Sequence, residues 1–147
     1  MILTSDAFLD NESIPTKYAC DGENVNPPLT LSLVPKDTKS LVLIVEDPDA
    51  PVKSNFTHWL LYNMPASLLQ ILKNTVPGDS MVGLNDVGTA SYQGPCPPSG
   101  THRYFFKVFA LNNILDLPRG AQKDQVIEAM KGHIIESAEL VGLYTKK

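Results

Sequence analysis

Twelve prolines, most of them clustered, constrain this 147-residue chain more than any other feature. Proline lacks a backbone N–H donor and is excluded from helix interiors and central strands. The pattern therefore predicts strands separated by rigid loops, with no long helix before residue 120. Three clusters lie next to apolar runs: Pro27 with Pro28, Pro48 with Pro51, and Pro95 with Pro97 and Pro98.

Five apolar segments between these loops are typical of strands. Residues 29–33 alternate Leu-Thr-Leu-Ser-Leu, which indicates a half-buried strand. Residues 40–46 are a continuous apolar, β-branched run, which indicates a central strand covered on both faces. We expect further strands at residues 57–63, 103–111 and 138–145.

One helix is expected, beginning at Lys123. Its apolar residues recur at helical spacing, and Gly132 weakens or ends it. The spaced residues are Val126, Ile127, Met130 and Ile134. A short turn around residues 66–72 is a candidate second helix. Because strands dominate, we predict a mainly β fold, either a β-sandwich or a closed sheet, with peripheral helices.

Composition and charge limit what the chain does. Hydrophobic residues make up 43% and charged residues 19%, which is typical of one globular domain over residues 1–147. The net charge of −4 gives no electrostatic footprint for nucleic acid or an anionic membrane surface. The N-terminus lacks the pattern of a signal peptide, and the longest apolar run, residues 41–45, is too short to span a bilayer. We therefore expect a cytoplasmic protein.

The two cysteines, Cys20 and Cys96, are too few for a disulfide framework or a cysteine-rich zinc site. Because disulfides are uncommon in the cytosol, we expect free thiols. The sequence leaves open whether the two residues pair. It also contains no cofactor motif.

The first candidate functional loop is Glu46-Asp47-Pro48-Asp49-Ala50-Pro51. Two prolines stiffen it, so its carboxylates are presented in a fixed place. The simpler alternative is a turn in which an Asp side chain caps backbone N–H groups. Asp49 suits that capping role better than Asp47, which follows the strand directly.

Two histidines are the other candidates. His58 begins the strand after this loop, and His102 ends the glycine- and proline-rich loop that starts at Gly94 and Pro95. Each is alternatively a hydrogen-bonded structural histidine. Together with Asp47 they suit three kinds of chemistry: anion binding by two imidazoles, metal binding by two His and one carboxylate, or acid–base catalysis.

Two further basic residues are expected outside this group. His133, near the end of the predicted helix, is expected to be structural. Arg103 is expected to point away from His102 and to pair with an acid, because successive strand residues face opposite sides.

Taken together, these loops resemble the signature regions of the phosphatidylethanolamine-binding proteins, also called Raf kinase inhibitor-like proteins. The resemblance rests on Asp47 to Pro51, on Gly94-Pro95 followed by His102-Arg103-Tyr104, and on His58 between them. Residues 20–29 and 132–144 resemble the prokaryotic branch. The resemblance covers nearly the whole chain.

The resemblance implies a Greek-key β-sandwich of two packed, antiparallel-rich sheets with a few short peripheral helices. It also implies a small pocket for phosphate, acetate or phosphorylethanolamine. Asp47, His58 and His102 would form the polar floor. The wall and flanking contacts would come from Gly94, Pro95, Cys96, Pro51 and Tyr104. Ala50-Pro51 becomes a candidate cis peptide.

Two departures from the animal members matter. The chain lacks their extra C-terminal helix, so a lipid or Raf-kinase role does not carry over directly. Cys96 replaces a proline, which predicts a more mobile pocket wall carrying a thiol. Lys53 is the one lysine in either loop, so attraction of an anion would come from His and backbone N–H groups.

Three functional hypotheses follow. The preferred one is a non-enzymatic module that binds phosphoryl or carboxylate groups and modulates a kinase or protease. The alternatives are a metal-assisted or acid–base hydrolase using Asp47, His58 and His102, and an interaction protein with a vestigial pocket. No cofactor is expected. Exposed edge strands would allow a homodimer.

Overall fold

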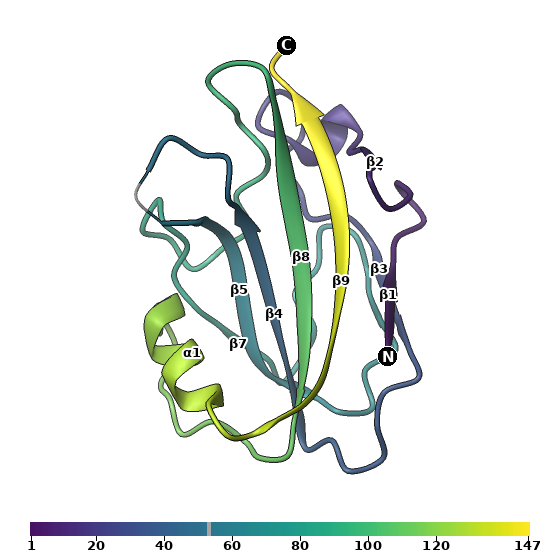
Figure 1. Cartoon of the computed structure of the whole chain (residues 1–147), viewed down its shortest axis with the longest axis vertical. Coiled ribbons are helices and arrows are strands. Elements are labelled where there is room, and N and C mark those ends of the chain that lie inside the picture. Colours follow the sequence, from purple (N-terminus) through teal and green to yellow (C-terminus); the bar gives the residue numbers. More distant parts are fainter. Residues whose placement is uncertain (53) are drawn as a thin grey trace.

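The computed structural model describes residues 1–52 and 54–147, so Lys53 lies outside the described residues. Two β-sheets pack against each other, as Figure 1 shows, which confirms the prediction of a mainly β sandwich. The smaller sheet has the order β1 (Ile2–Thr4), β3 (Leu29–Ser32), β6 (Gln70–Ile71). The larger sheet has the order β2 (Glu12–Ser13), β9 (Ile134–Thr145), β8 (Thr101–Leu111), β4 (Ser40–Asp47), β5 (Phe56–Pro65), β7 (Met81–Val82).

The larger sheet is built from two antiparallel pairs, β4 with β5 and β8 with β9, joined by antiparallel pairing of β4 with β8. Only β2 runs parallel to its neighbour β9 among the strand pairs of the described residues. Every residue of β4 is buried, as its continuous apolar run predicts for a strand covered on both faces. The connection from β5 to β8 carries the chain to the other side of β4.

Two apolar cores cover the two faces of the larger sheet. Between the sheets, Trp59, Leu61 and Phe106 are fully buried. On the opposite face, the helix α1 (Lys123–Met130) lies beside the larger sheet (Figure 1). Its Val126 and Met130 share a buried apolar cluster with Leu60 and Tyr62. Because successive strand residues point to opposite faces, the uninterrupted apolar sequence of β5 serves both cores.

The predicted helix is confirmed, but it ends earlier than its apolar spacing predicted. The helix α1 ends at Met130, and Ile134 already belongs to β9, which starts earlier than predicted. Gly132 adopts a φ of 79° in the turn between them, a conformation that glycine adopts without steric cost. The expected second helix at residues 66–72 is wrong, because this segment makes a turn and then pairs as β6 with β3. A short 3-10 helix, η1 (Thr16–Tyr18), lies near the N-terminus instead.

Cys20 and Cys96 form a disulfide with their Cα atoms 5.4 Å apart, so the expectation of free thiols is wrong. The bond ties the segment after η1 to the loop before β8, across 76 residues of sequence. The expectation that Cys96 gives the pocket wall a free thiol is wrong for the same reason, and the expected mobility of the wall stays a prediction. Disulfides persist in oxidising compartments and in some thermophilic cells, so the pairing weighs against the expectation of a reducing cytoplasm.

The edges of both sheets are short. In the described part of the chain β2, β6 and β7 have two residues each, and β1 has three. Short edge strands offer little backbone for pairing with a second copy. None of the helices in the described residues has the length and apolar character needed to cross a membrane.

Candidate functional site

Asp47, His58 and His102 meet at one end of the larger sheet, around a cavity of about 290 Å³. Asp47 ends β4, His58 lies near the start of β5, and His102 near the start of β8. Since β4 lies between β5 and β8, and both run antiparallel to it, these three ends come together. The three side chains are buried, with residue exposures of 3%, 5% and 8%.

His102 is held by Asp47. Its Nδ1 donates to Oδ2 of Asp47 at 2.7 Å, and the other carboxylate oxygen accepts the backbone N–H of Asp49 at 2.7 Å. The carboxylate is therefore satisfied within the protein, and it fixes which imidazole nitrogen carries a proton. Nε2 of His102 has no hydrogen-bond partner in the described residues.

His58 is held by a backbone carbonyl. Its Nδ1 lies 2.7 Å from the carbonyl oxygen of Gln93, and a carbonyl only accepts, so Nδ1 carries the hydrogen. Burial lowers the pKa of His58, although the Gln93 carbonyl and the charge of Asp47 oppose that shift. Near neutral pH this imidazole is uncharged, and its Nε2 is a hydrogen-bond acceptor without a partner in the described residues.

Tyr104 adds a hydroxyl to the cavity. Its residue is 1% exposed, and its ring lies 5.2 Å from that of His58 and 6.4 Å from that of His102, between centroids. The hydroxyl has no hydrogen-bond partner within the described residues. Burial and the charge of Asp47 raise the pKa of Tyr104, so the hydroxyl keeps its proton. The residue expected as a flanking contact thus supplies an unused polar group.

Apolar side chains form the rest of the lining. Val52 and Val87 are 53% and 59% exposed at the cavity. Pro51 and Cys96 line the cavity as predicted, but seven other lining residues were not predicted from the sequence: Ala50, Val52, Phe56, Val87, Gln93, Pro97 and Pro98. The aromatic residue two positions before His58 and the Pro-Pro pair after Cys96 were usable signals. Nothing in the sequence indicated the carbonyl of Gln93.

Gly94 and Pro95 lie behind the wall, not among the described lining residues. The N–H of Gly94 donates to Oδ1 of Asn24 at 2.8 Å, and the carbonyl of Pro95 accepts the N–H of Cys20 at 3.0 Å. A Cβ at Gly94 would collide with the carbonyl oxygen of Tyr18. Here glycine permits a close approach to the N-terminal segment and not to the cavity.

The loop after β4 is arranged differently from expectation. Asp47, not Asp49, caps the local backbone, while Asp49 accepts three hydrogen bonds of 2.9 Å from the backbone N–H, Nε and Nη2 of Arg103. These bonds from Arg103 lower the pKa of Asp49 to about 2. The prediction that Arg103 points away from His102 and pairs with an acid is confirmed. The Ala50–Pro51 bond is trans, so the expected cis peptide is wrong.

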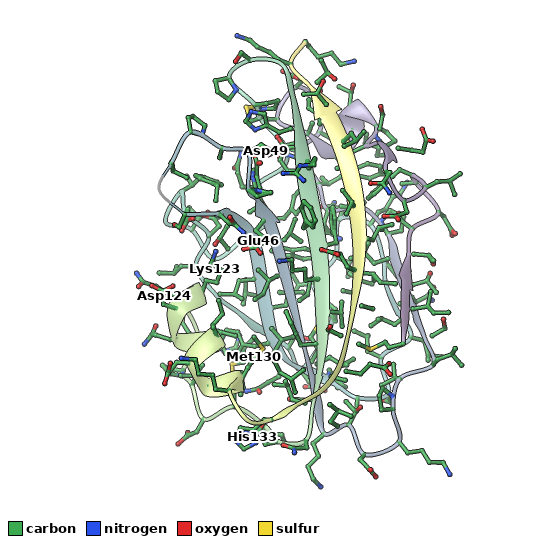
Figure 2. The ribbon with its side chains drawn as sticks, in the orientation of Figure 1. Glu46, Asp49, Lys123, Asp124, Met130 and His133 are labelled. Atoms are coloured by element: carbon green, nitrogen blue, oxygen red, sulfur yellow. A yellow bond between two sulfur atoms is a disulfide. The ribbon has the colours of Figure 1, made fainter. Side chains whose placement is uncertain are left out.

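His133 is far from this site. Figure 2 shows Asp49 and His133 toward opposite ends of the molecule. Nδ1 of His133 bonds with Oδ1 of Asn112 at 2.9 Å. It therefore belongs to the turn before β9.

The hydrogen-bonding character of the cavity changes with pH, because each imidazole Nε2 is an acceptor when the ring is neutral and a donor when it is protonated. With neutral imidazoles, the two Nε2 atoms accept hydrogen bonds and Tyr104 donates one. When the imidazoles are protonated, all three groups donate. No group of three or more His, Cys, Asp or Glu side chains suited to a metal is found in the described residues.

Comparison with known proteins agrees with this architecture. A family model described as phosphatidylethanolamine-binding protein matches residues 4–145. A "UPF0098 protein" from Methanothermobacter thermautotrophicus is 49% identical, with 99% of each chain covered. Another "UPF0098 protein", from Chlamydia trachomatis, is 46% identical, with 99% of each chain covered.

Solved structures are similar as well. A phosphatidylethanolamine-binding protein homologue from Chlamydia trachomatis superimposes with a TM-score of 0.95 at 44% identity, covering 99% of this chain and 97% of its own. Escherichia coli YbcL, described as a member of the mammalian family, gives a TM-score of 0.92 at 32% identity, with 99% and 98% covered.

Proposed function

This chain belongs to the phosphatidylethanolamine-binding protein family, and on that premise we propose that it is a non-enzymatic binding protein for phosphoryl or carboxylate groups. The ligand would occupy the cavity above Asp47, His58 and His102, with Tyr104 as a further donor. One observation carries the proposal. Both imidazoles are anchored through Nδ1 and leave Nε2 free beside an unpartnered hydroxyl.

The proposed binding is linked to protons. Each Nδ1 already carries a hydrogen, so Nε2 donates to an anion only when the ring is protonated. A ligand that keeps an acidic proton can instead give it to Nε2. In both cases ligand and proton enter together, and affinity rises as the pH falls toward and below the ordinary His pKa of about 6.5.

The exposed Val52 and Val87 favour a ligand carried by a larger molecule. They place apolar surface next to a polar floor, an arrangement typical of binding sites where few polar groups fix the orientation. We propose that the natural ligand is a phosphoryl or carboxylate group with an adjoining apolar portion, and that a kinase or protease presenting such a group is a candidate partner.

The cavity gives less support to hydrolysis. Among its described lining residues there is no Ser, Thr or free Cys to act as a nucleophile. The Asp47 carboxylate is occupied by His102 and the Asp49 N–H, so it is not free to activate a water.

An NMR titration with phosphate and phosphorylethanolamine, at pH values of about 5.5 and 8, tests the proposal. We expect saturable amide shifts around Asp47, His58 and His102, stronger at the lower pH. A His102→Gln variant should bind about tenfold more weakly, because a charged donor is lost. Arg103→Gln is the matched control, since it lies next in β8 and bonds to Asp49 outside the cavity. Equal binding by both variants would contradict the assignment.

A further inference from the structure

The disulfide lies in the wall of the cavity, and its two halves are placed differently. Cys96 is exposed and lines the cavity, while Cys20 is half-buried and is not among the described lining residues. A thiolate cleaves a disulfide by attacking a sulfur that it can reach. We propose that this disulfide is a redox-active group of the cavity, and that a small thiol entering the cavity attacks Sγ of Cys96.

The lining of the cavity suits this attack. The attacking species is the thiolate, so an entering thiol must lose its proton. Nε2 of His58 is an acceptor near neutral pH, as argued above from its bond to the Gln93 carbonyl. His58 and His102 line the same cavity as Cys96, so a base is available where the thiol enters.

The exchange balances without an outside oxidant. The thiolate RS⁻ forms an S–S bond to Sγ of Cys96 while the Cys96–Cys20 bond breaks, and Cys20 leaves as a thiolate that takes a proton. A second RS⁻ attacks the sulfur of the bound RS group, releasing RSSR and the Cys96 thiolate, which is then protonated. Overall, two RSH are oxidised and one protein disulfide is reduced to two thiols.

The surrounding contacts make the exchange reversible. The N–H of Cys20 donates to the carbonyl of Pro95 at 3.0 Å, and the hydroxyl of Tyr92 donates to the carbonyl of Tyr18 at 2.8 Å. With the Gly94–Asn24 bond, these contacts join the same two segments without the disulfide. Both sulfurs therefore stay close after reduction, so the bond can form again.

The preference for one class of thiol rests on the proposed function, in which the cavity binds carboxylates. If the cavity takes carboxylates, a thiol with a carboxylate is held beside Cys96 while it reacts. A bound anion such as phosphate would fill the same space and slow the attack. The favoured reductant is thus a small anionic thiol.

The test treats the oxidised full-length protein with 3-mercaptopropionate or with the neutral 2-mercaptoethanol, followed at early times by N-ethylmaleimide and peptide mass mapping. We expect about tenfold more mixed disulfide on Cys96 than on Cys20 with either thiol, since only Cys96 faces the cavity. The same reaction in denaturing urea is the control, in which the preference should disappear. Equal labelling of the folded protein, a preference for Cys20, or no reaction would overturn the proposal.

A second arm separates this proposal from the proposed function. Where NMR shows phosphate bound, saturating phosphate should slow formation of the Cys96 adduct. Unchanged rates under bound phosphate would overturn the placement of the attack inside the cavity. If phosphate does not bind at all, the anion function fails, and the mapping with neutral 2-mercaptoethanol still decides the redox proposal.

Discussion

Glu46 and Asp47 are consecutive carboxylates at the end of β4, but they face opposite sides of the sheet. Glu46 pairs with two lysines beside the helix, whereas Asp47 pairs with a histidine at the cavity. Glu46 points toward α1, where Oε1 accepts from Lys107 at 2.8 Å and Oε2 from Lys123 at 3.0 Å. Figure 2 shows Glu46 beside Lys123 at the start of the helix. Asp47 points into the cavity, where His102 is its side-chain partner.

The two sides of the sheet differ in whether their polar side chains have all found hydrogen-bond partners within the protein. On the helix side, Lys123 also donates to the carbonyl of Asn55 at 3.1 Å, so the cluster is closed by contacts within the protein. On the cavity side, both imidazoles are held through Nδ1, and their Nε2 atoms have no hydrogen-bond partner in the described residues. The buried hydroxyl of Tyr104 also has no partner there. Buried polar groups are normally satisfied, and the Tyr104 hydroxyl is the one unsatisfied buried atom of the described residues on the lining of this cavity, where a ligand can satisfy it.

The largest expected effect concerns how the cavity side is held together. Replacing both cysteines by serine removes a link across 76 residues, which costs about 4 kcal/mol of unfolding free energy in the chain-entropy account. The helix side should be unaffected. Urea unfolding of Cys20→Ser/Cys96→Ser, compared with the oxidised wild type, measures this, and the reduced wild type is the matched control that should resemble the variant. A loss below about 1 kcal/mol would mean that hydrogen bonds alone hold the wall.

Glu46→Gln should separate stability from binding. The change leaves two lysines facing a neutral amide, and because this cluster is part-buried and partly screened by solvent, the loss should be about 1–2 kcal/mol. Phosphate affinity should stay the same, because Glu46 faces away from the cavity. Asp47→Asn is the matched variant and should weaken phosphate binding. Chemical denaturation and NMR titration of both variants provide the comparison. A Glu46→Gln protein that keeps its stability but binds phosphate more weakly would contradict this assignment of the two carboxylates to different sides.

The two sides should also titrate in different pH windows. The lowered pKa of His58 means that the unfolded chain binds a proton before the folded one, so stability is lost as pH falls below about 6.5. Burial would raise the pKa of Glu46, but hydrogen bonds from Lys107 and Lys123 outweigh it and lower the pKa, so its contribution is lost only below about 4.5.

Urea unfolding of wild type and His58→Gln at several pH values tests these windows without ligand. The variant should lose the decline between neutral pH and about pH 5 and keep the decline at lower pH. Phosphate should oppose the first decline in the wild type, because it binds the protonated form. An unchanged pH profile in the variant would contradict the role given to His58.

The smallest expected effect is that of Arg103→Gln. Its ion pair with Asp49 is well formed, but the arginine side chain is 54% exposed and solvent screens the interaction. We expect a loss below about 1 kcal/mol despite the low pKa of Asp49. Thermal unfolding at neutral pH measures it. A loss above about 2 kcal/mol would show that the Arg103–Asp49 pair contributes more to the unfolding free energy than an exposed ion pair normally does.

The sequence predicted the strands wherever an apolar run was long. The runs at β4 and β5 are long because both strands are covered on both faces, whereas β8 buries every second residue along most of its length. It failed at residues 66–72, where two residues of β6 owe their conformation to pairing with β3. Local pattern carries no information about such a distant partner.

The candidate site divides in the same way. Asp47, His58 and His102 were predictable, because rigid loops and strand ends present side chains in fixed places. The exchange of roles between Asp47 and Asp49 depends on the position of Arg103, 54 residues away from Asp49. The disulfide and the Gln93 carbonyl depend on the folded path of the chain, and neither has a signature in the sequence.

The protonation of the two imidazoles tests the central claim most directly. Side-chain ¹⁵N NMR of histidine-labelled protein, near neutral pH with and without phosphate, reads Nδ1 and Nε2 separately. We predict that His58 without phosphate carries its proton on Nδ1 alone, and that phosphate adds a proton or a strong hydrogen bond at Nε2 of both His58 and His102. Imidazole signals that stay unchanged while phosphate binds elsewhere would contradict the account.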